Sequence, residues 1–215
     1  MAGISPFVLG LLILIFLLSS KAFKDSIFFN RLKFNVGAVE NGEYYRLFTA
    51  GFIHVDQQHL LFNCLTLYFF GDNLVYGLGI VNAVVLYVVS LLIGNVFAFL
   101  FHRQNPYYSA VGASGAIMGV VYSAILIFPE MRLGFFFFPI PIPAYIFGVG
   151  YLIYTLLGMK RQQDGIGHTA HLGGAIGGII CTIVFDITVI ERSGGTLLLM
   201  IGVTLLAAVV FFRKT

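Results

Sequence analysis

The sequence contains few charged residues and no tryptophan. Only 10% of its 215 residues are Asp, Glu, Lys or Arg, whereas 59% are hydrophobic and 23 are phenylalanine. Soluble domains carry about 25% charged residues, so this composition excludes an ordinary soluble protein. The mean hydropathy of +0.97 is typical of a chain that crosses a membrane repeatedly. We therefore expect an all-α, polytopic membrane protein folded as a helical bundle.

Other scarcities exclude whole classes of function. The net charge is only +3 and the basic residues are scattered, so no patch indicates a nucleic-acid partner. The two cysteines, Cys64 and Cys181, lie inside apolar runs, where a free thiol is usually a small core residue. His168 and His171 are three residues apart, but no Cys, Asp or Glu joins them at metal-ligand spacing on that helix. We therefore expect no metal site.

Several apolar segments approach the length of about 20 residues that a transmembrane helix needs. They are Ile4–Ser20, Leu60–Tyr76, Ile80–Phe101, Ala113–Phe128, Pro143–Leu157, Thr169–Ile190 and Thr196–Phe212. The first has no basic residue before it and no A-x-A site after it, which favours a retained helix over a signal peptide. Prolines at positions 139, 141 and 143 exclude a continuous helix through residues 135–147. The fifth helix should therefore begin at Pro143 and span only about 24 Å.

The long first connection, residues 21–58, is too apolar for a solvated linker and too polar for a membrane span. It mixes phenylalanines with lysines and arginines, which predicts that it lies in the membrane interface or packs on the side of the bundle. Arg46 and His54 within it are expected to hold the connection in place by hydrogen bonds.

Small residues accompany two polar side chains inside apolar segments. In "VGASGAIMG", Ser114 is followed by Gly115 and Gly119, and in "HTAHLGGAIGG", His171 is followed on one helix face by Gly174 and Gly178. Such small-residue faces let two helices approach closely. They can therefore bring the Ser114 hydroxyl within hydrogen-bond reach of His171.

A second polar pair, His59 and Asn63, lies four residues apart on one helix face. The segments that carry His59, Ser114 and His171 all begin on the same side of the membrane, so one plane can hold all three residues. Serine becomes a nucleophile when histidine takes its proton, and the developing oxyanion needs donors. The amides of Ala113 and Ser114, together with His59 and Asn63, could supply them, which is the set of roles that acyl transfer requires.

Each of these residues also has an ordinary structural interpretation. Serine between glycines is common where helices pack, and His59 with Asn63 could be a satisfied polar pair in the bundle core. Asp186 is the only carboxylate on the helix of His171 and lies about 22 Å from it, which favours a dyad over a triad.

Taken together, three motifs in order resemble the rhomboid family of intramembrane serine proteases. They are "EYYRLFTAGFIHVDQQHLLFN" (43–63), "GASGAIMG" (112–119) and "GHTAHLGGAIGG" (167–178). The resemblance implies that Ser114 attacks a peptide carbonyl, that His171 is base and then acid, and that His59, Asn63 and the amides near Ser114 hold the oxyanion. The substrate would be a membrane protein cut in or near its transmembrane segment, without ATP or metal. The residues expected to support the site are Arg46, His54, Gly112, Gly115, Met118 and Gly174.

The resemblance also implies an arrangement in the membrane. Residues 1–190 would form a six-helix catalytic core and residues 191–215 an additional C-terminal transmembrane helix. The active site would face the extracytoplasmic side of the cell membrane. With a cytoplasmic start, only Arg132 and Arg192 of the basic residues would then be inside, which opposes the positive-inside rule.

Some residues depart from the family pattern, and other functions compete. Met118 replaces an aromatic ring that often packs on the catalytic histidine, Val75 replaces a frequent glutamate, and Tyr45 replaces a frequent tryptophan. A non-catalytic relative that binds or escorts client transmembrane helices is the main alternative to a protease. A small transporter would need paired charges or broken helices near the midplane, and neither is clear here.

Overall fold

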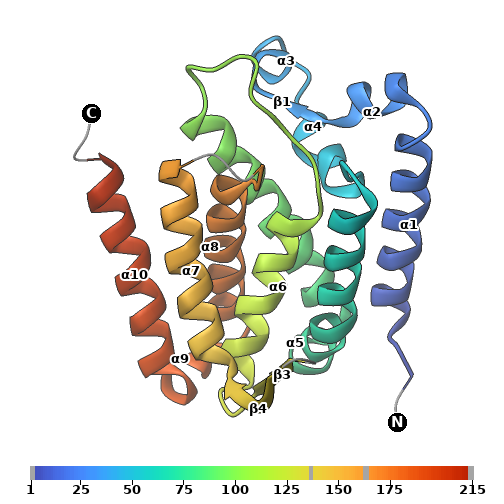
Figure 1. The fold of residues 1–215 in the computed structure, drawn as a ribbon. Coiled ribbons are helices and arrows are strands. Elements are labelled where there is room, and N and C mark those ends of the chain that lie inside the picture. Colours follow the sequence, from blue (N-terminus) through green and yellow to red (C-terminus); the bar gives the residue numbers. More distant parts are fainter. Residues whose placement is uncertain (1–2, 136–137, 162–164, 213–215) are drawn as a thin grey trace.

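Helices dominate the fold, and the long ones lie roughly along one common axis (Figure 1). The computed structural model describes residues 3–135, 138–161 and 165–212. The elements in chain order are α1 (Pro6–Ala22), α2 (Ser26–Leu32), β1 (Phe34–Asn35), α3 (Val36–Glu40), α4 (Arg46–Thr49), η1 (Ala50–Phe52), α5 (Gln57–Phe101), β2 (Ser109–Ala110), α6 (Ser114–Ile127), β3 (Arg132–Phe135), β4 (Phe138–Pro143), α7 (Ala144–Arg161), α8 (His168–Phe185), α9 (Val189–Arg192) and α10 (Gly194–Phe212).

Helix α5 consists of two antiparallel halves that meet at Gly79. This residue has φ 77° and ψ 160°, a conformation outside the helical region that glycine adopts without steric cost. The chain therefore descends the bundle through the first half and ascends through the second (Figure 1). The break falls between the predicted segments Leu60–Tyr76 and Ile80–Phe101, which confirms that they are separate helical stretches.

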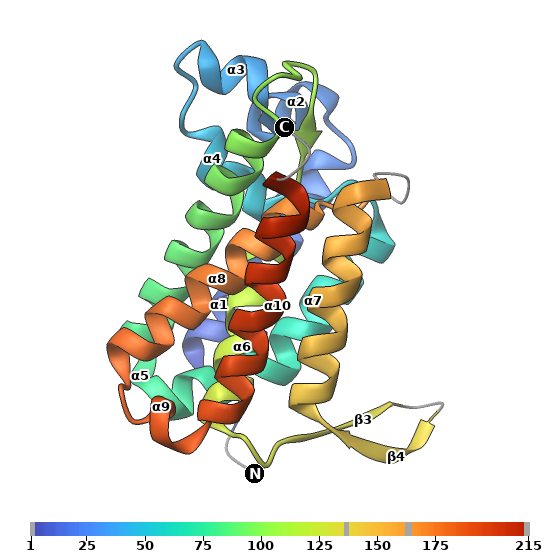
Figure 2. The same cartoon turned by 90° about the vertical axis from the view of Figure 1, so that its left-hand side faces the viewer.

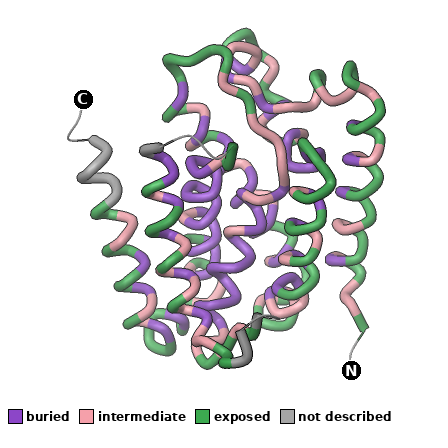
Figure 3. Tube along the Cα trace, in the orientation of Figure 1, coloured by how far each residue is buried: buried purple, intermediate pink, exposed green. Residues whose placement is uncertain are grey.

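Glycines allow close packing of α6 against α8 at the centre of the bundle. A Cβ atom on Gly174 would run into the backbone of Gly115, and one on Gly178 would run into the backbone of Gly119. The predicted small-residue faces therefore do meet each other. Most residues of both helices are buried, as the purple segments in Figure 3 show. Helices α5 and α7 pack against both of them, whereas α1 packs on α5 and α10 packs on α7.

The first connection packs on one end of the bundle, whereas the sequence predicted a place in the membrane interface or on the side of the bundle. Its buried residues Phe34, Val36 and Val39 form an apolar cluster with Ala98 at the end of α5 and Ala170 in the first turn of α8. Strand β1 also pairs with β2, which tethers the connection to the chain just before α6.

A β-hairpin at the opposite end was not predicted and corrects the purely α-helical expectation. Strands β3 and β4 pair antiparallel and extend beside the lower end of α7 (Figure 2). Pro143 closes β4 opposite Arg132, so α7 begins at Ala144 and not at Pro143. Proline cannot donate a ladder hydrogen bond but is accepted on an edge strand, which explains why the prolines form a strand here. Helix α7 then continues to Arg161, beyond the short helix predicted.

Helix α8 ends at Phe185, whereas the predicted segment continued to Ile190. The Asp186 carboxylate accepts hydrogen bonds from the Thr188 amide and hydroxyl and pairs with Arg192 at 2.8 Å. Local side-chain bonds of this kind compete with continuation of a helix. The short helix α9 and then α10 follow this turn.

Among the described residues, two helices are long and apolar enough to cross a membrane, namely Gln57–Phe101 and His168–Phe185. Shorter apolar helices cover Pro6–Ala22, Ser114–Ile127, Ala144–Met159 and Gly194–Leu206. Helix α1 begins at one end of the bundle and α10 ends at the other (Figure 1).

Candidate active site

Ser114 is the first residue of α6, directly after a sharp turn at Gly112. Gly112 has φ 125°, and its amide donates to the Ala50 carbonyl at 2.9 Å. A Cβ atom on Gly112 would also lie only 2.6 Å from the His59 ring. Both the backbone conformation and the lack of space therefore require glycine there. This turn fixes the point at which α6 begins and thus the position of the Ser114 hydroxyl.

His171 lies in the first turn of α8 and meets Ser114 from the neighbouring helix. Its Nε2 atom is 2.6 Å from the Ser114 Oγ atom, and the histidine side chain is buried. The expected hydrogen bond between these two side chains is therefore present. A neutral imidazole can accept the serine proton at Nε2, which is the geometry that activates a serine nucleophile.

A third polar group, which the sequence did not indicate, contacts the other ring nitrogen of His171. The Tyr151 hydroxyl on α7 lies 3.0 Å from His171 Nδ1, and the two ring centroids are 6.0 Å apart. The expected neighbour, Met118, lines the same cleft as His171. An aromatic ring thus reaches the histidine from α7 and not from α6.

His59 and Asn63 face the same cleft as the serine and histidine. Asp56 caps the start of α5 by accepting from the His59 amide at 2.7 Å, and Asn63 Nδ2 donates to the His59 carbonyl at 2.9 Å. The cleft has a volume of about 1390 Å³ and is lined by His59, Asn63, Ser114, Met118 and His171 together with other residues. His59 and Asn63 therefore line the same cleft as the serine hydroxyl.

Apolar side chains from several elements extend the cleft away from these polar groups. They include Phe62, Phe69 and Phe70 of α5, Val121 of α6, Phe147 of α7 and Leu133 of β3. The cleft therefore extends from the serine and histidine along apolar side chains of these elements, and Asn73 and Arg132 line it as well.

The Ala113 amide has a different partner from the one predicted. It donates to His54 Nε2 at 3.4 Å, so it is engaged within the protein and does not point freely at an oxyanion. Because Nε2 accepts, Nδ1 of His54 carries the proton and donates to the Ser19 hydroxyl at 2.9 Å. The Ser114 amide, at the start of α6 where donors lack an intrahelical acceptor, stays a candidate oxyanion donor.

His54 holds the end of the first connection against α1 and α6, as expected. Its side chain is fully buried, and this burial lowers the pKa of the imidazole from 6.5 to about 3, with the nearby His59 adding to the effect. The ring is therefore neutral and acts as a fixed bridge beside the Ser114 turn.

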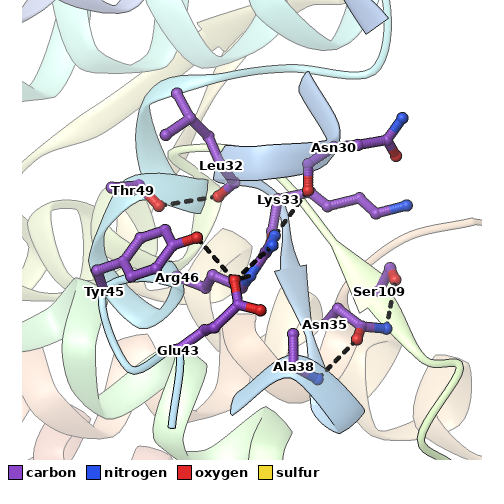
Figure 4. A network of polar contacts seen from close by, with 10 residues as sticks. All are labelled: Asn30, Leu32, Lys33, Asn35, Ala38, Glu43, Tyr45, Arg46, Thr49 and Ser109. Atoms are coloured by element: carbon purple, nitrogen blue, oxygen red, sulfur yellow. Dashed lines mark hydrogen bonds and ion pairs between the residues drawn. The ribbon is translucent and has the colours of Figure 1, made fainter. Parts of the chain in front are cut away.

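Arg46 organises the first connection farther from the serine (Figure 4). Its Nη1 donates to the carbonyls of Asn30 at 2.7 Å and Lys33 at 2.8 Å, and its Nε donates to Glu43 at 2.8 Å. The Tyr45 hydroxyl donates to the same Glu43 oxygen, and this bond, followed by the one from Arg46, lowers the pKa of Glu43. The predicted structural role of Arg46 is therefore supported by a defined network.

No group of three or more His, Cys, Asp or Glu side chains that could hold a metal ion occurs within residues 3–135, 138–161 and 165–212. The site instead offers a hydroxyl, an imidazole and hydrogen-bond donors, which together suit acyl transfer.

Comparisons with known proteins show the family to which the chain belongs. A family model described as the rhomboid domain matches residues 41–186, the part that contains Ser114 and His171. The chain is 32% identical over 153 residues to "Putative rhomboid protease YdcA" of Bacillus subtilis, covering 68% of this chain and 69% of that protein. It is 27% identical over 166 residues to "Rhomboid protease AarA" of Providencia stuartii, with 67% and 57% covered.

A plant relative shows the breadth of the similarity. The chain is 28% identical over 170 residues to "RHOMBOID-like protein 12, mitochondrial" of Arabidopsis thaliana, covering 72% of this chain and 50% of that protein. The chain thus spans about half the length of the Arabidopsis and Providencia relatives. On the match of the family model to most of its length, the chain belongs to the rhomboid family of integral membrane proteins.

Proposed function

We propose that this protein is an intramembrane serine endopeptidase that hydrolyses a peptide bond in or near the transmembrane segment of membrane-protein substrates. The observation that carries the proposal is the 2.6 Å approach of Ser114 Oγ to His171 Nε2 in a cleft with a largely apolar lining. A hydroxyl that only satisfied helix packing would not need an imidazole partner inside such a cleft.

The reaction follows from the roles of these groups. The Ser114 oxygen attacks the peptide carbonyl carbon while His171 Nε2 takes the hydroxyl proton. The resulting oxyanion is stabilised by the Ser114 amide and by the side chains of His59 and Asn63. His171 then gives its proton to the leaving amine as the C–N bond breaks. A water molecule, activated by the same imidazole, hydrolyses the acyl-enzyme and restores the serine.

The helices also support an arrangement in the membrane. In this proposal, α1, the two halves of α5, α6, α7 and α8 form the six-helix core within residues 1–190, and α10 is the additional helix within 191–215. The active site lies at the same end as the first connection and faces the extracytoplasmic side of the cell membrane. Water reaches the dyad from that end, while the bilayer surrounds the apolar helix faces.

The apolar wall of the cleft suits a substrate that is itself a transmembrane helix. The peptide bonds of a helix are hidden by hydrogen bonds, so a substrate must unwind locally before Ser114 can attack it. Substrates with helix-breaking glycine or proline near the cut bond should therefore be cleaved faster.

The proposal is tested with the purified chain in detergent and a model single-span substrate. The wild-type protein should produce two fragments, and Ser114→Ala and His171→Ala should each produce none above background. Cleavage that persists in Ser114→Ala would refute the proposal. Equal binding of the substrate by wild type and Ser114→Ala, without cleavage by either, would instead support the alternative of a non-catalytic protein that binds or escorts transmembrane clients.

A further inference from the structure

We propose that Tyr151 is a positioning residue for the dyad, whose hydroxyl accepts the Nδ1–H of His171 and thereby fixes the ring tautomer that can activate Ser114. This inference rests on the proposed protease function and names a third group that acts through the histidine. The group comes from a third helix, α7, whereas Ser114 and His171 lie on α6 and α8.

Both ring nitrogens of His171 have a hydrogen-bond partner. Ser114 Oγ lies 2.6 Å from Nε2, and the Tyr151 oxygen lies 3.0 Å from Nδ1. Both distances are within hydrogen-bond range. The ring therefore lies between a hydroxyl on each side, which fixes its orientation as well as its position.

The chemistry determines the direction of the two bonds. For His171 to take the serine proton, Nε2 must be unprotonated, so the single proton of the neutral ring must be on Nδ1. The Nδ1–H then donates to the Tyr151 oxygen, whose own proton can point elsewhere. If Nδ1 lacked an acceptor, the ring could place its proton on Nε2 and donate to Ser114, which is the unproductive tautomer.

The neutral phenol of Tyr151 can accept the hydrogen bond from His171 Nδ1 at a lower cost in this environment than a carboxylate. In serine proteases of other folds an aspartate holds this nitrogen, but a charged side chain inside a membrane bundle is costly. Asp186, the carboxylate that directly follows α8, is about 22 Å away along the axis of that helix. Tyr151 therefore provides the acceptor without burying a charge.

Packing holds the Tyr151 ring independently of its hydroxyl. The ring stacks on Phe147, one turn earlier on α7, with centroids 6.0 Å apart and planes inclined by 28°. Because that contact does not use the hydroxyl, Tyr151→Phe should keep the ring in place and remove only the hydrogen bond. The variant thus separates positioning of the histidine from packing of α7.

The experiment uses the full chain in detergent micelles with ¹⁵N-labelled histidine, and assigns the His171 signals with His171→Gln. In the wild type the ring nitrogens should report the Nδ1–H tautomer, and in Tyr151→Phe they should shift toward a mixture with the Nε2–H form. In the cleavage assay Tyr151→Phe should lower kcat about 10- to 100-fold and leave KM nearly unchanged. Tyr145→Phe, which removes a hydroxyl elsewhere on α7, should change neither measurement.

Two outcomes would overturn the proposal, namely unchanged His171 nitrogen signals in Tyr151→Phe, or a kcat within about twofold of wild type. Failure of the proposed function has a different signature, because the wild type would then cleave no faster than Ser114→Ala. The nitrogen signals would still decide whether Tyr151 sets the tautomer, since they do not depend on cleavage.

Discussion

Gly115 of α6 and Gly174 of α8 lie so close together that a methyl group on Gly174 would coincide with the Gly115 carbonyl group. Gly115 directly follows Ser114, and Gly174 lies one turn after His171 on the same helix. This backbone contact therefore sets the separation of the serine and the histidine. The proposed chemistry depends on two residues that have no side chain at all.

The first prediction concerns that contact. Gly174→Ala should force α6 and α8 apart, because the new Cβ atom meets backbone that cannot rotate away. We expect a loss of at least about 2 kcal/mol in the free energy of unfolding and a large fall in cleavage rate. Chemical unfolding in micelles and the substrate assay measure the two effects.

Gly202→Ala on α10 is the matched control, because a Cβ atom there would meet nothing within 4 Å. It should leave both stability and cleavage near wild type. A Gly174→Ala protein as stable and active as Gly202→Ala would contradict the role assigned to the α6–α8 contact.

The second prediction concerns Arg46. Arg46→Ala removes the donors for the carbonyls of Asn30 and Lys33 and should cost about 2 kcal/mol of unfolding free energy. Arg46→Lys keeps the positive charge beside Glu43 but cannot donate in several directions at once, so its loss should be intermediate. If the alanine and lysine variants were equally stable, the forked geometry of the guanidinium would not matter.

The third prediction is a pH dependence that originates at His54. Burial lowers the pKa of this ring from 6.5 to about 3 in the folded protein. Between these values the unfolded chain binds a proton that the folded chain does not, so the free energy of unfolding should fall as the pH drops below 6.5. Above that pH His54 contributes no slope.

The variant His54→Asn tests the assignment, since it cannot titrate. Its stability should fall less steeply than that of the wild type when melting is followed from about pH 7 to about pH 4. Parallel curves for the two proteins would mean that another group causes the acid sensitivity.

Much of the site could be predicted because the residues that form it follow spacing patterns within single helices. The glycine spacing after Ser114 and after His171 predicts one helix face without large side chains on each of the two helices. Such faces let two helix backbones approach closely. The depth of both residues follows from their places in the first turns of α6 and α8. Sequence periodicity alone was therefore enough to predict this contact.

Other features depend on tertiary distances that no local pattern contains. Tyr151 reaches His171 because α7 packs beside α8, and no spacing within α7 shows which of its residues faces that neighbour. The Ala113 amide is engaged by His54, which lies far away along the chain and whose partner is set by the packing of the first connection. The proline-rich segment gave no strand signal beyond the exclusion of a helix, so the β3–β4 hairpin was missed.

The fourth prediction concerns the arrangement in the membrane. An odd number of crossings with a cytoplasmic start should leave a reporter fused after Thr215 on the extracytoplasmic side, the same side as a tag inserted in the first connection. The distribution of basic residues favours the opposite orientation, with the N-terminus on the extracytoplasmic side. The position of the reporter therefore discriminates between the two orientations. A reporter that reads out as cytoplasmic would contradict the proposed topology.

The most direct test of the central claim is covalent labelling with a fluorophosphonate, which reacts with serines that an adjacent base has activated. After digestion, mass spectrometry should find the adduct on Ser114 in the wild type and no adduct in His171→Ala, although the serine is still present there. Labelling of Ser114 at the same rate in both proteins, or no labelling of Ser114 in the folded wild type, would contradict the account.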